Sequence, residues 1–226
     1  GTLAIDSDAN LGASGGGLFL DAGTLRTAGS FTMNRDVALL GGASTFDIGT
    51  GTVTVIGSLS EEDGPGSLTK TGTGTLKLGG SSSYSGGTSV LAGTLQGTTA
   101  NLKGDILNNA TVSFNQTANG TYAGIMSGSG RLLIEGTARL TLSGANTYSG
   151  GTTVSAGVLQ GTTTSLQGNI LNNAAVSFNQ ATDGTYAGSM SGTGSLAVSG
   201  GGAVTLTGNN VYSGGTTIAS GSRLYI

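Results

Sequence analysis

A block of sequence returns at one fixed, long interval, and this interval constrains the fold more than any local feature. The block Tyr148-Ser-Gly-Gly-Thr152 has a copy that begins at Tyr84 (148 − 84 = 64) and another that begins at Tyr212 (212 − 148 = 64). A repeat of this length usually encodes a module that cannot bury its apolar face alone. The chain is therefore predicted to be a stack of similar modules.

Composition excludes several other kinds of chain. With 45 Gly, 1 Pro and 8% charged residues in 226, the chain is unlike an ordinary globular domain. The apolar residues recur regularly, which excludes a flexible linker, and no Gly-X-Y period is present, which excludes collagen. Eight Lys and Arg residues with a net charge of −3 argue against nucleic acid as a partner. Without cysteine there is neither a disulfide framework nor a thiolate metal site, and no apolar run is long enough for a transmembrane segment.

Short strands are predicted throughout. Runs such as Thr52–Ile56 are rich in Val, Ile, Thr and Leu and are bounded by Gly, Ser, Asp or Asn, which is the pattern of a strand between turns. No segment has the 3.6-residue apolar period of a helix. Residues 1–226 are predicted to form a single β-helical fragment, with less regular coils over 1–63 and regular 64-residue repeats over 64–226. Because the chain begins and ends inside its pattern, we expect it to be a piece of a longer protein.

A shorter spacing inside the repeat places β-branched residues in one column. The steps are 20 or 22 residues, close to one turn of a right-handed parallel β-helix, in which equivalent side chains lie about 4.8 Å apart. We therefore predict an all-β fold, a right-handed parallel β-helix (β-solenoid) with about 21 residues per coil and roughly 10–11 coils. Lys70 interrupts the column, so the first copy is either offset there or turns Lys70 outward. The predicted core column is Val90, Val112, Ile134, Val154, Val176, Val198 and Ile218.

The Tyr-Ser-Gly-Gly-Thr blocks are predicted to be turns that lead into the strands of this column. Glycine supplies positive φ and allows close backbone approach. The tyrosine rings are predicted to pack over a coil edge with the hydroxyl in water; the alternative is that they are anchors for a sugar or a protein. The predicted turn residues are Tyr84, Gly86, Gly87, Tyr148, Gly150, Gly151, Tyr212, Gly214 and Gly215, and Tyr122 and Tyr186 recur in the same way.

Repeated asparagines form a candidate binding face. Asn108 and Asn109 recur as Asn172 and Asn173. They form either an inward ladder or an outward polar face, and a repeated outward face would suit weak multivalent contacts. Equivalent positions of successive copies are expected to lie three coils apart, so these asparagines do not stack directly on one another. Thr-x-Thr runs such as Thr50–Thr54 also raise the hypothesis of an ice- or surface-binding solenoid, but they occur irregularly.

Catalytic and metal-binding patterns are weak. Histidine is absent, which removes the usual base of a serine nucleophile, so Ser14 in Gly12-Ala-Ser-Gly-Gly16 is interpreted as part of a glycine turn. Asp6–Asn10 begins like a calcium loop but lacks the required Gly and Glu further on, which favours an Asx-type turn. Glu61–Asp63 is interpreted as a solvated loop. The chain is predicted not to be an enzyme and to hold no cofactor and no metal.

A longer pattern carries a resemblance to a known family. The run Gly66–Leu78, followed by Tyr84–Val90 and Ala92–Leu95, recurs at 130–159 and 194–224. It resembles the passenger-associated transport repeat of bacterial autotransporters. Two departures occur: Lys70 has Ile134 and Val198 as counterparts, and Ser82 has Asn146 and Asn210.

The resemblance implies a segment of an autotransporter passenger at the bacterial cell surface, on the outer side of the outer membrane or released from it. It implies a C-terminal β-barrel translocator in the parent protein. The implied role is a rigid stalk and an adhesin or self-association module, with host surface components, matrix components or a second copy as partners. The alternative is a non-binding scaffold for an enzymatic or toxin domain elsewhere in the parent chain. Because an open solenoid end exposes unpaired strand edges, the ends are predicted to be stacked or capped.

Overall fold

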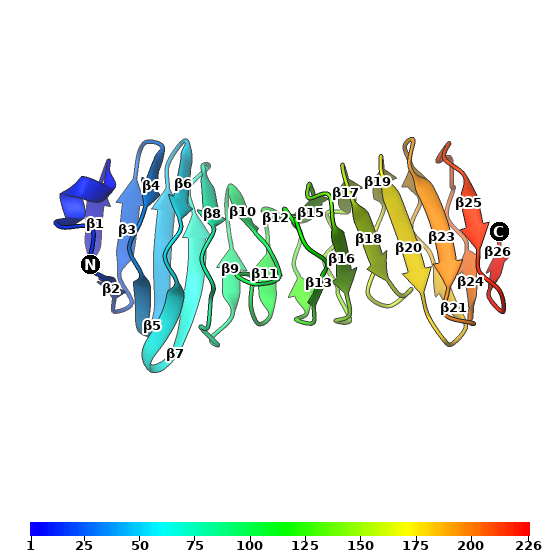
Figure 1. Cartoon of the computed structure of the whole chain (residues 1–226), viewed down its shortest axis with the longest axis horizontal. Coiled ribbons are helices and arrows are strands. Elements are labelled where there is room, and N and C mark those ends of the chain that lie inside the picture. The colour runs from blue at the N-terminus through cyan, green and yellow to red at the C-terminus, as the bar shows by residue number, and fades with distance from the viewer. The chain divides into compact units, whose positions relative to one another are not determined.

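The computed structural model describes all 226 residues, and they form short parallel strands (Figure 1). The strands stack as about 11 turns of a β-solenoid, which confirms the predicted all-β parallel architecture. One short 3-10 helix, η1 (Asp8–Leu11), is present, and no helix is long and apolar enough to cross a membrane. The chain falls into two compact units, Gly1–Ser113 and Phe114–Ile226, which are described separately.

The first unit contains two long parallel sheets. One has the order β1-β3-β5-β7-β9-β11, with β2 added to β5, and the other has the order β4-β6-β8-β10. The strands are β1 (Thr2–Ile5), β2 (Leu18–Leu20), β3 (Thr24–Thr27), β4 (Phe31–Met33), β5 (Val37–Ile48), β6 (Thr52–Val55), β7 (Leu59–Thr71), β8 (Thr75–Leu78), β9 (Thr88–Val90), β10 (Thr94–Gly97) and β11 (Ile106–Asn108). The strand β12 (Thr111–Phe114) contains the junction between the two units.

The second unit contains three parallel sheets. Their orders are β15-β17-β19-β22, β13-β16-β18-β20-β23-β25 and β21-β24-β26. The strands are β13 (Gly120–Tyr122), β14 (Met126–Ser127), β15 (Arg131–Ile134), β16 (Arg139–Leu142), β17 (Thr152–Val154), β18 (Val158–Gly161), β19 (Ile170–Asn172), β20 (Ala175–Asn179), β21 (Gly184–Tyr186), β22 (Met190–Ser191), β23 (Ser195–Ser199), β24 (Ala203–Leu206), β25 (Thr216–Ile218) and β26 (Arg223–Tyr225).

Alternation along each strand builds the core. In β8, Leu76 and Leu78 are buried, and Lys77 between them is exposed. The register places Leu76 between Val53 of the preceding coil and Leu95 of the following one, and all three side chains are fully buried. Burial of an aliphatic side chain of this size stabilises a fold by about 2 kcal/mol. Stacked aliphatic columns of this kind hold the coils together.

The coils of the second unit are shorter than the average spacing in the sequence predicts. Ile134 pairs with Val154 (154 − 134 = 20), and Val154 pairs with Asn172 (172 − 154 = 18). Three such coils are shorter than one sequence repeat, so the repeat is not a whole number of coils. As a result Val154 lies in the sheet of β15 and β19, whereas its counterpart Ile218 lies in the sheet of β20 and β23. The expectation that equivalent positions of successive copies lie three whole coils apart is therefore wrong.

The observed register distributes the predicted core column over different sheets, so only some of its members are direct neighbours. Ile134 with Val154, and Val198 with Ile218, are direct neighbours. The neighbour of Val154 in the following coil is Asn172, however, and Val176 pairs instead with residues of β18 and β23. Val90 likewise pairs with Asn108 and not with Val112. Six of the seven column residues are at most 1% exposed, and Ile218, in the last coil, is 48% exposed.

Lys70 keeps its register and points inward. It pairs with Phe46 on one side and Val90 on the other, and its side chain is 0% exposed. Both sequence-based options, an offset and an outward Lys70, are therefore wrong. The aliphatic stem continues the apolar stack, and only the terminal amine needs polar partners.

Backbone carbonyls provide those partners. The Nζ of Lys70 donates to the carbonyl oxygens of Thr71 (2.5 Å), Gly72 (2.8 Å) and Ala92 (3.2 Å). Burial lowers the pKa of Lys70 to about 8, against the opposing attraction of Asp47. Three carbonyls at the turns thus replace water around an amine inside the coil.

The two ends of the chain differ. At the first coil, η1 packs against β1 and β4, and Arg35, which is 2% exposed, holds this loop in place. Its Nε lies 2.7 Å from Oδ1 of Asp8, and its Nη1 donates to the carbonyls of Leu11 and Gly16. The last coil leaves Tyr225 54% exposed, so no cap formed by this chain covers it, and the stacking of two such ends stays a prediction.

Candidate functional site

The two glycines of each repeat turn have different functions. In the second copy, Gly151 has φ of 77°, a conformation that favours glycine. A Cβ at Gly150 would lie 2.6 Å from the carbonyl of Gly130 in the preceding coil, so only glycine allows that approach. The same close approach occurs at Gly86 and Gly214, and the positive φ recurs at Gly87 but not at Gly215.

The tyrosines of these turns are buried structural residues. The ring of Tyr148 is 2% exposed, and its hydroxyl lies 2.7 Å from Oγ1 of Thr152. Burial raises the pKa of Tyr148 to about 12, and the hydrogen bond with Thr152 only partly opposes this. Tyr84 makes the same contact with Thr88. A hydroxyl in water and a role as a binding anchor are therefore both wrong for Tyr84 and Tyr148, whereas Tyr212, in the last coil, is partly exposed.

In each pair of the candidate asparagine face, the first side chain points into the coil and the second points outward. Asn108 and Asn172 are 0% exposed, so they belong to the interior and cannot form a binding face. The side chain of Asn172 accepts a hydrogen bond from the backbone N–H of Ala174 and donates to the carbonyl of Ser195. Asn109 and Asn173 are exposed. Of the four asparagines, only these two lie at the surface, where Oδ1 of Asn173 accepts the N–H of Thr193 (3.4 Å).

Other sequence motifs lie in turns. Ser14 is exposed in a turn that leads into strand β2 and not into a helix. Within Asp6–Asn10, Oδ1 of Asn10 accepts the backbone N–H groups of Asp6 and Ser7, and Asp8 is paired with Arg35. This geometry is that of a side-chain-stabilised turn.

Glu61 fastens its own loop to the next coil. One carboxylate oxygen accepts the N–H and the hydroxyl of Ser85 and the N–H of Gly66. The N–H bonds from Ser85 and Gly66 lower the pKa of Glu61. No cluster of three or more acidic residues that could hold a metal ion is present.

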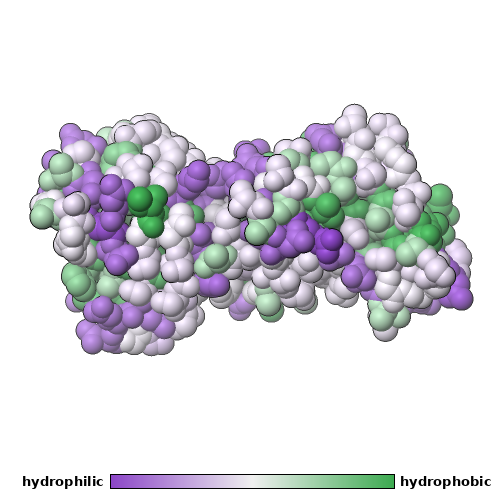
Figure 2. All heavy atoms as spheres, viewed as in Figure 1, coloured by the Kyte–Doolittle hydropathy of each residue, from purple (hydrophilic) through white to green (hydrophobic).

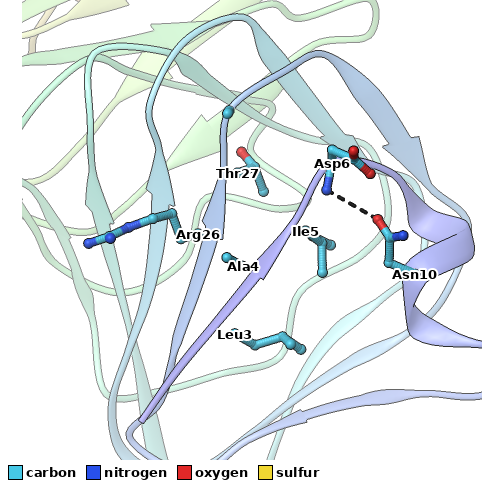
Figure 3. A pocket seen from close by; sticks show the side chains of 8 residues that line it. Leu3, Ala4, Ile5, Asp6, Asn10, Arg26 and Thr27 are labelled. Atoms are coloured by element: carbon cyan, nitrogen blue, oxygen red, sulfur yellow. Dashed lines mark hydrogen bonds between the residues drawn. The ribbon is translucent and has the colours of Figure 1, made fainter.

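A hollow of about 450 Å³ lies in the first unit at the outermost strand β1 (Figure 3). Leu3, Ala4 and Ile5 of β1 and Arg26 and Thr27 of β3 line it. The Oγ1 of Thr27 is buried without a hydrogen-bond partner. Ala28, Asp6 and Asn10 complete the lining, which is half aliphatic and half polar. The side chains of Asp6, Asn10, Arg26 and Thr27 do not form a recognisable catalytic arrangement.

A second, polar groove lies in the second unit along β21. Two adjoining hollows of about 390 and 560 Å³ share Thr163, Thr164 and Thr185. Nothing in the sequence marked this groove, because its walls come from two successive coils whose register the repeat alone does not reveal. It is the candidate binding site of this chain.

Comparisons with known proteins match this chain to one repeat family and to one autotransporter protein. The model of the family "Passenger-associated-transport-repeat" matches residues 68–96, 135–160 and 196–222. The chain is also 35% identical over 136 residues to the protein named "Adhesin BmaC autotransporter" of Brucella suis biovar 1 (strain 1330). That match covers 58% of this chain but only 4% of the relative. No solved structure matches the chain.

The family matches coincide with the structural repeat. Each of the three contains one Tyr-Ser-Gly-Gly-Thr block and the strands around it, such as β8 and β9 in the first copy. The strands of one matched segment pair with strands that lie between the matches, as β9 does with β11 and β18 with β20, so the stack also depends on residues outside the matches. The three matches to the passenger-associated transport repeat and the similarity to an autotransporter protein support the resemblance to an autotransporter passenger that the sequence predicted.

Proposed function

We propose that this chain is a stalk segment of a passenger on the bacterial cell surface and that it takes part in adhesion or self-association. The observation that carries the proposal is the 35% identity to a protein named as an adhesin. Because the chain spans about 4% of that relative, the activity of the whole protein is part of the proposal. The passenger would reach the surface through a C-terminal translocator of the parent protein and stay there or be released.

The surface chemistry supports contact with polar partners. Most of the visible surface is pale in hydropathy, with small hydrophilic and hydrophobic patches (Figure 2). This follows from a chain rich in Gly and low in charge, at 8%. Such a surface offers hydroxyl and amide groups and few charges, which favours weak hydrogen-bonded contacts over electrostatic capture. Host surface glycans, matrix proteins and a second copy of the chain are all partners of this kind.

We also infer that the chain is not itself an enzyme. Histidine is absent. Two serine hydroxyls do donate to carboxylates, Ser58 to Asp36 and Ser85 to Glu61. Backbone N–H groups bind the same carboxylates and lower their pKa values, which makes them weak bases. The alternative function is a non-binding scaffold for an enzymatic or toxin domain elsewhere in the parent chain, and the stacked coils would serve that function equally well.

Coated beads test the proposal. Fluorescent beads carrying the purified chain should attach to cultured animal cells or to immobilised matrix, or should clump with one another, more than beads carrying albumin. Attachment without clumping supports adhesion to a host partner, and clumping alone supports self-association. If the beads neither attach nor clump, the chain is a spacer.

A further inference from the structure

Strand β21 has one edge with no strand beside it. It is the outermost strand of the sheet β21-β24-β26, and the carbonyl of Tyr186 accepts the N–H of Thr207 on the β24 side. Backbone groups of successive residues in a strand point to opposite edges, so the N–H and C=O of Thr185 point away from β24. On that side lies the loop of residues 162–169 in place of a strand.

This loop touches the stretch 184–188 at two places, at Thr163 and at Gly168, and leaves space between them. A Cβ on Gly184 would collide with Oγ1 of Thr163, and a Cβ on Gly188 would collide with the carbonyl of Gly168. The hydroxyl of Tyr186 also donates to the carbonyl of Gly168 (2.5 Å). Between these contacts the loop stands away from Thr185, and the two hollows of about 390 and 560 Å³ open there.

The walls of the groove are fixed before any ligand arrives. Oε1 of Gln180 accepts the N–H of Thr163 (2.9 Å), and Nε2 of Gln180 donates to the carbonyl of Ala203 (3.0 Å). Leu166, at the base of the loop, is 1% exposed. A preorganised wall lowers the entropy that binding must overcome.

The polar groups that line the groove are nearly all uncharged. They are the hydroxyls of Thr162, Thr163, Thr164, Thr182, Thr185 and Tyr186, the amides of Gln167, Asn169, Asn179 and Gln180, and one carboxylate, that of Asp183. No Lys or Arg lines either hollow, so a phosphate, sulfate or sugar acid would meet a negative charge without a compensating positive one. Hydroxyls both donate and accept, which matches the free N–H and C=O of Thr185 and the threonine hydroxyls.

We propose that the groove around Thr185 binds a neutral sugar unit of a glycan. The inference rests on the adhesive function proposed above and names the ligand class. An extended peptide, the usual partner of a free strand edge, needs several consecutive backbone groups. Here the loop contacts at Gly184 and Gly188 leave only the short stretch around Thr185 open, which suits a compact polyol and not a strand.

The first copy of the repeat supplies a variant that preserves the fold. Asn119 is the counterpart of Asp183, and its Oδ1 accepts the N–H of Arg139 (3.0 Å), just as Oδ1 of Asp183 accepts the N–H of Ala203 (2.8 Å). Asp183→Asn therefore keeps the structural hydrogen bond and removes only the charge. It isolates the carboxylate as a sugar ligand.

Titration of the full chain with sugars, followed by ¹H–¹⁵N NMR, tests the proposal. The probes are the methyl glycosides of glucose, galactose, mannose and N-acetylglucosamine, with glucuronic acid as the charged comparison. We expect shifts centred on Thr185 with at least one neutral probe, a Kd on the order of 1 mM, and weaker shifts with glucuronic acid. No shifts with any neutral probe, or shifts centred elsewhere, would overturn the assignment.

Two variants and a matched control locate the site. Ala187→Tyr fills the exposed rim of the groove and should weaken binding more than about tenfold, and Asp183→Asn should weaken it about three- to tenfold. Ala123→Tyr places the same side chain at the equivalent exposed position of the first copy and should leave the Kd unchanged. Circular dichroism shows whether each variant is folded. Equal losses in Ala187→Tyr and Ala123→Tyr would refute a local site.

The bead assay separates this inference from the proposed function. Beads that attach to cells equally well with the Ala187→Tyr chain leave adhesion standing and refute the groove as its site. Sugar binding by a chain whose beads neither attach nor clump leaves the groove standing and refutes the adhesive function. Loss of attachment and of sugar binding together in Ala187→Tyr supports both.

Discussion

The buried amine of Lys70 predicts that stability rises with pH across the alkaline range. In the unfolded chain a lysine has a pKa of 10.5, and in the folded chain burial lowers that of Lys70 to about 8. Between these values the unfolded state binds a proton that the folded state has released, so raising the pH favours the folded state. Below about pH 8 both states are protonated, and the folded chain carries the full cost of an ammonium group inside the coil.

The size of the effect follows from the difference between the two pKa values. Each pKa unit is worth about 1.4 kcal/mol, so the fall from 10.5 to about 8 (10.5 − 8 = 2.5) sets an upper value of about 3.5 kcal/mol. The carbonyls of Thr71, Gly72 and Ala92 and residual solvent screening reduce this value, and we expect about 2 kcal/mol. Lys70→Met keeps a long flexible stem of similar volume and removes the titrating group. The difference in unfolding free energy between the two chains isolates the amine.

Urea unfolding at a series of pH values from 7 to 10.5 measures that difference. A stack of coils can also unfold in parts, so the comparison requires that circular dichroism and tyrosine fluorescence give coincident transitions. The buried tyrosines have raised pKa values, so they lower the unfolding free energy of the chain at high pH. This effect is the same in both chains and cancels in the difference. Between pH 7 and 10.5, the unfolding free energy of the natural chain minus that of Lys70→Met should rise by about 2 kcal/mol.

Two results would refute the reasoning. A constant difference across this range would mean that the amine has the same pKa folded and unfolded, so that the carbonyls replace water fully. A difference that falls with pH would mean that the carbonyls and Asp47 stabilise the ammonium more than water does. A direct check is the ¹³Cε NMR signal that disappears in Lys70→Met, whose titration gives the folded-state pKa.

Further predictions concern the turns and the buried polar groups, and urea unfolding checks the first two. Gly150→Val should lower the free energy of unfolding by about 3 kcal/mol, because its Cβ would meet the backbone of the preceding coil. Unchanged stability would show that the turn does not pack against that coil. Asn146→Ala should lower the free energy of unfolding by about 2–3 kcal/mol, because the N–H of Met126 and the carbonyl of Ser165 lose their partner. At the counterpart position, Ser82→Ala should be neutral or stabilising by up to about 1 kcal/mol, since the buried Ser82 hydroxyl has no partner. Arg35→Met should abolish amide hydrogen-exchange protection in residues 7–17 while β17 stays protected; retained protection there would refute its role in holding the loop.

Much of the fold could be predicted from the sequence because its signals are local. Alternation in runs such as Thr75–Leu78 fixes which side chains are buried, and the glycines at 150 and 151 mark a turn. Register could not be predicted, because it depends on how many residues each turn uses. The turns of the second unit use fewer residues than the average period suggested, so a column drawn at constant spacing moves from one sheet to the next.

Lys70 illustrates the limit more sharply. Its charge indicated an outward side chain, since a buried ammonium without partners is costly. The partners are carbonyls of turns, which the sequence shows only as Gly72 and Ala92, with no polar side chain to reveal them. The groove around Thr185 is hidden for a similar reason, because its hydrogen-bonding groups are partly backbone atoms of an unpaired strand edge. Side-chain patterns identify the core well and backbone-lined sites poorly.

The mismatch between the sequence repeat and the coil also bears on how such a segment can bind. Because one sequence repeat is not a whole number of coils, the counterpart strands β17 and β25 lie in different sheets of the second unit. Equivalent side chains of successive copies then point in different directions, so a repeated motif does not build one continuous multivalent face. Binding must instead depend on local features that one copy forms by itself. The groove at Thr185 is of this kind, since the first copy has Lys103 and Asp105 at the positions of Gln167 and Asn169. A lining without Lys or Arg is therefore specific to the second copy.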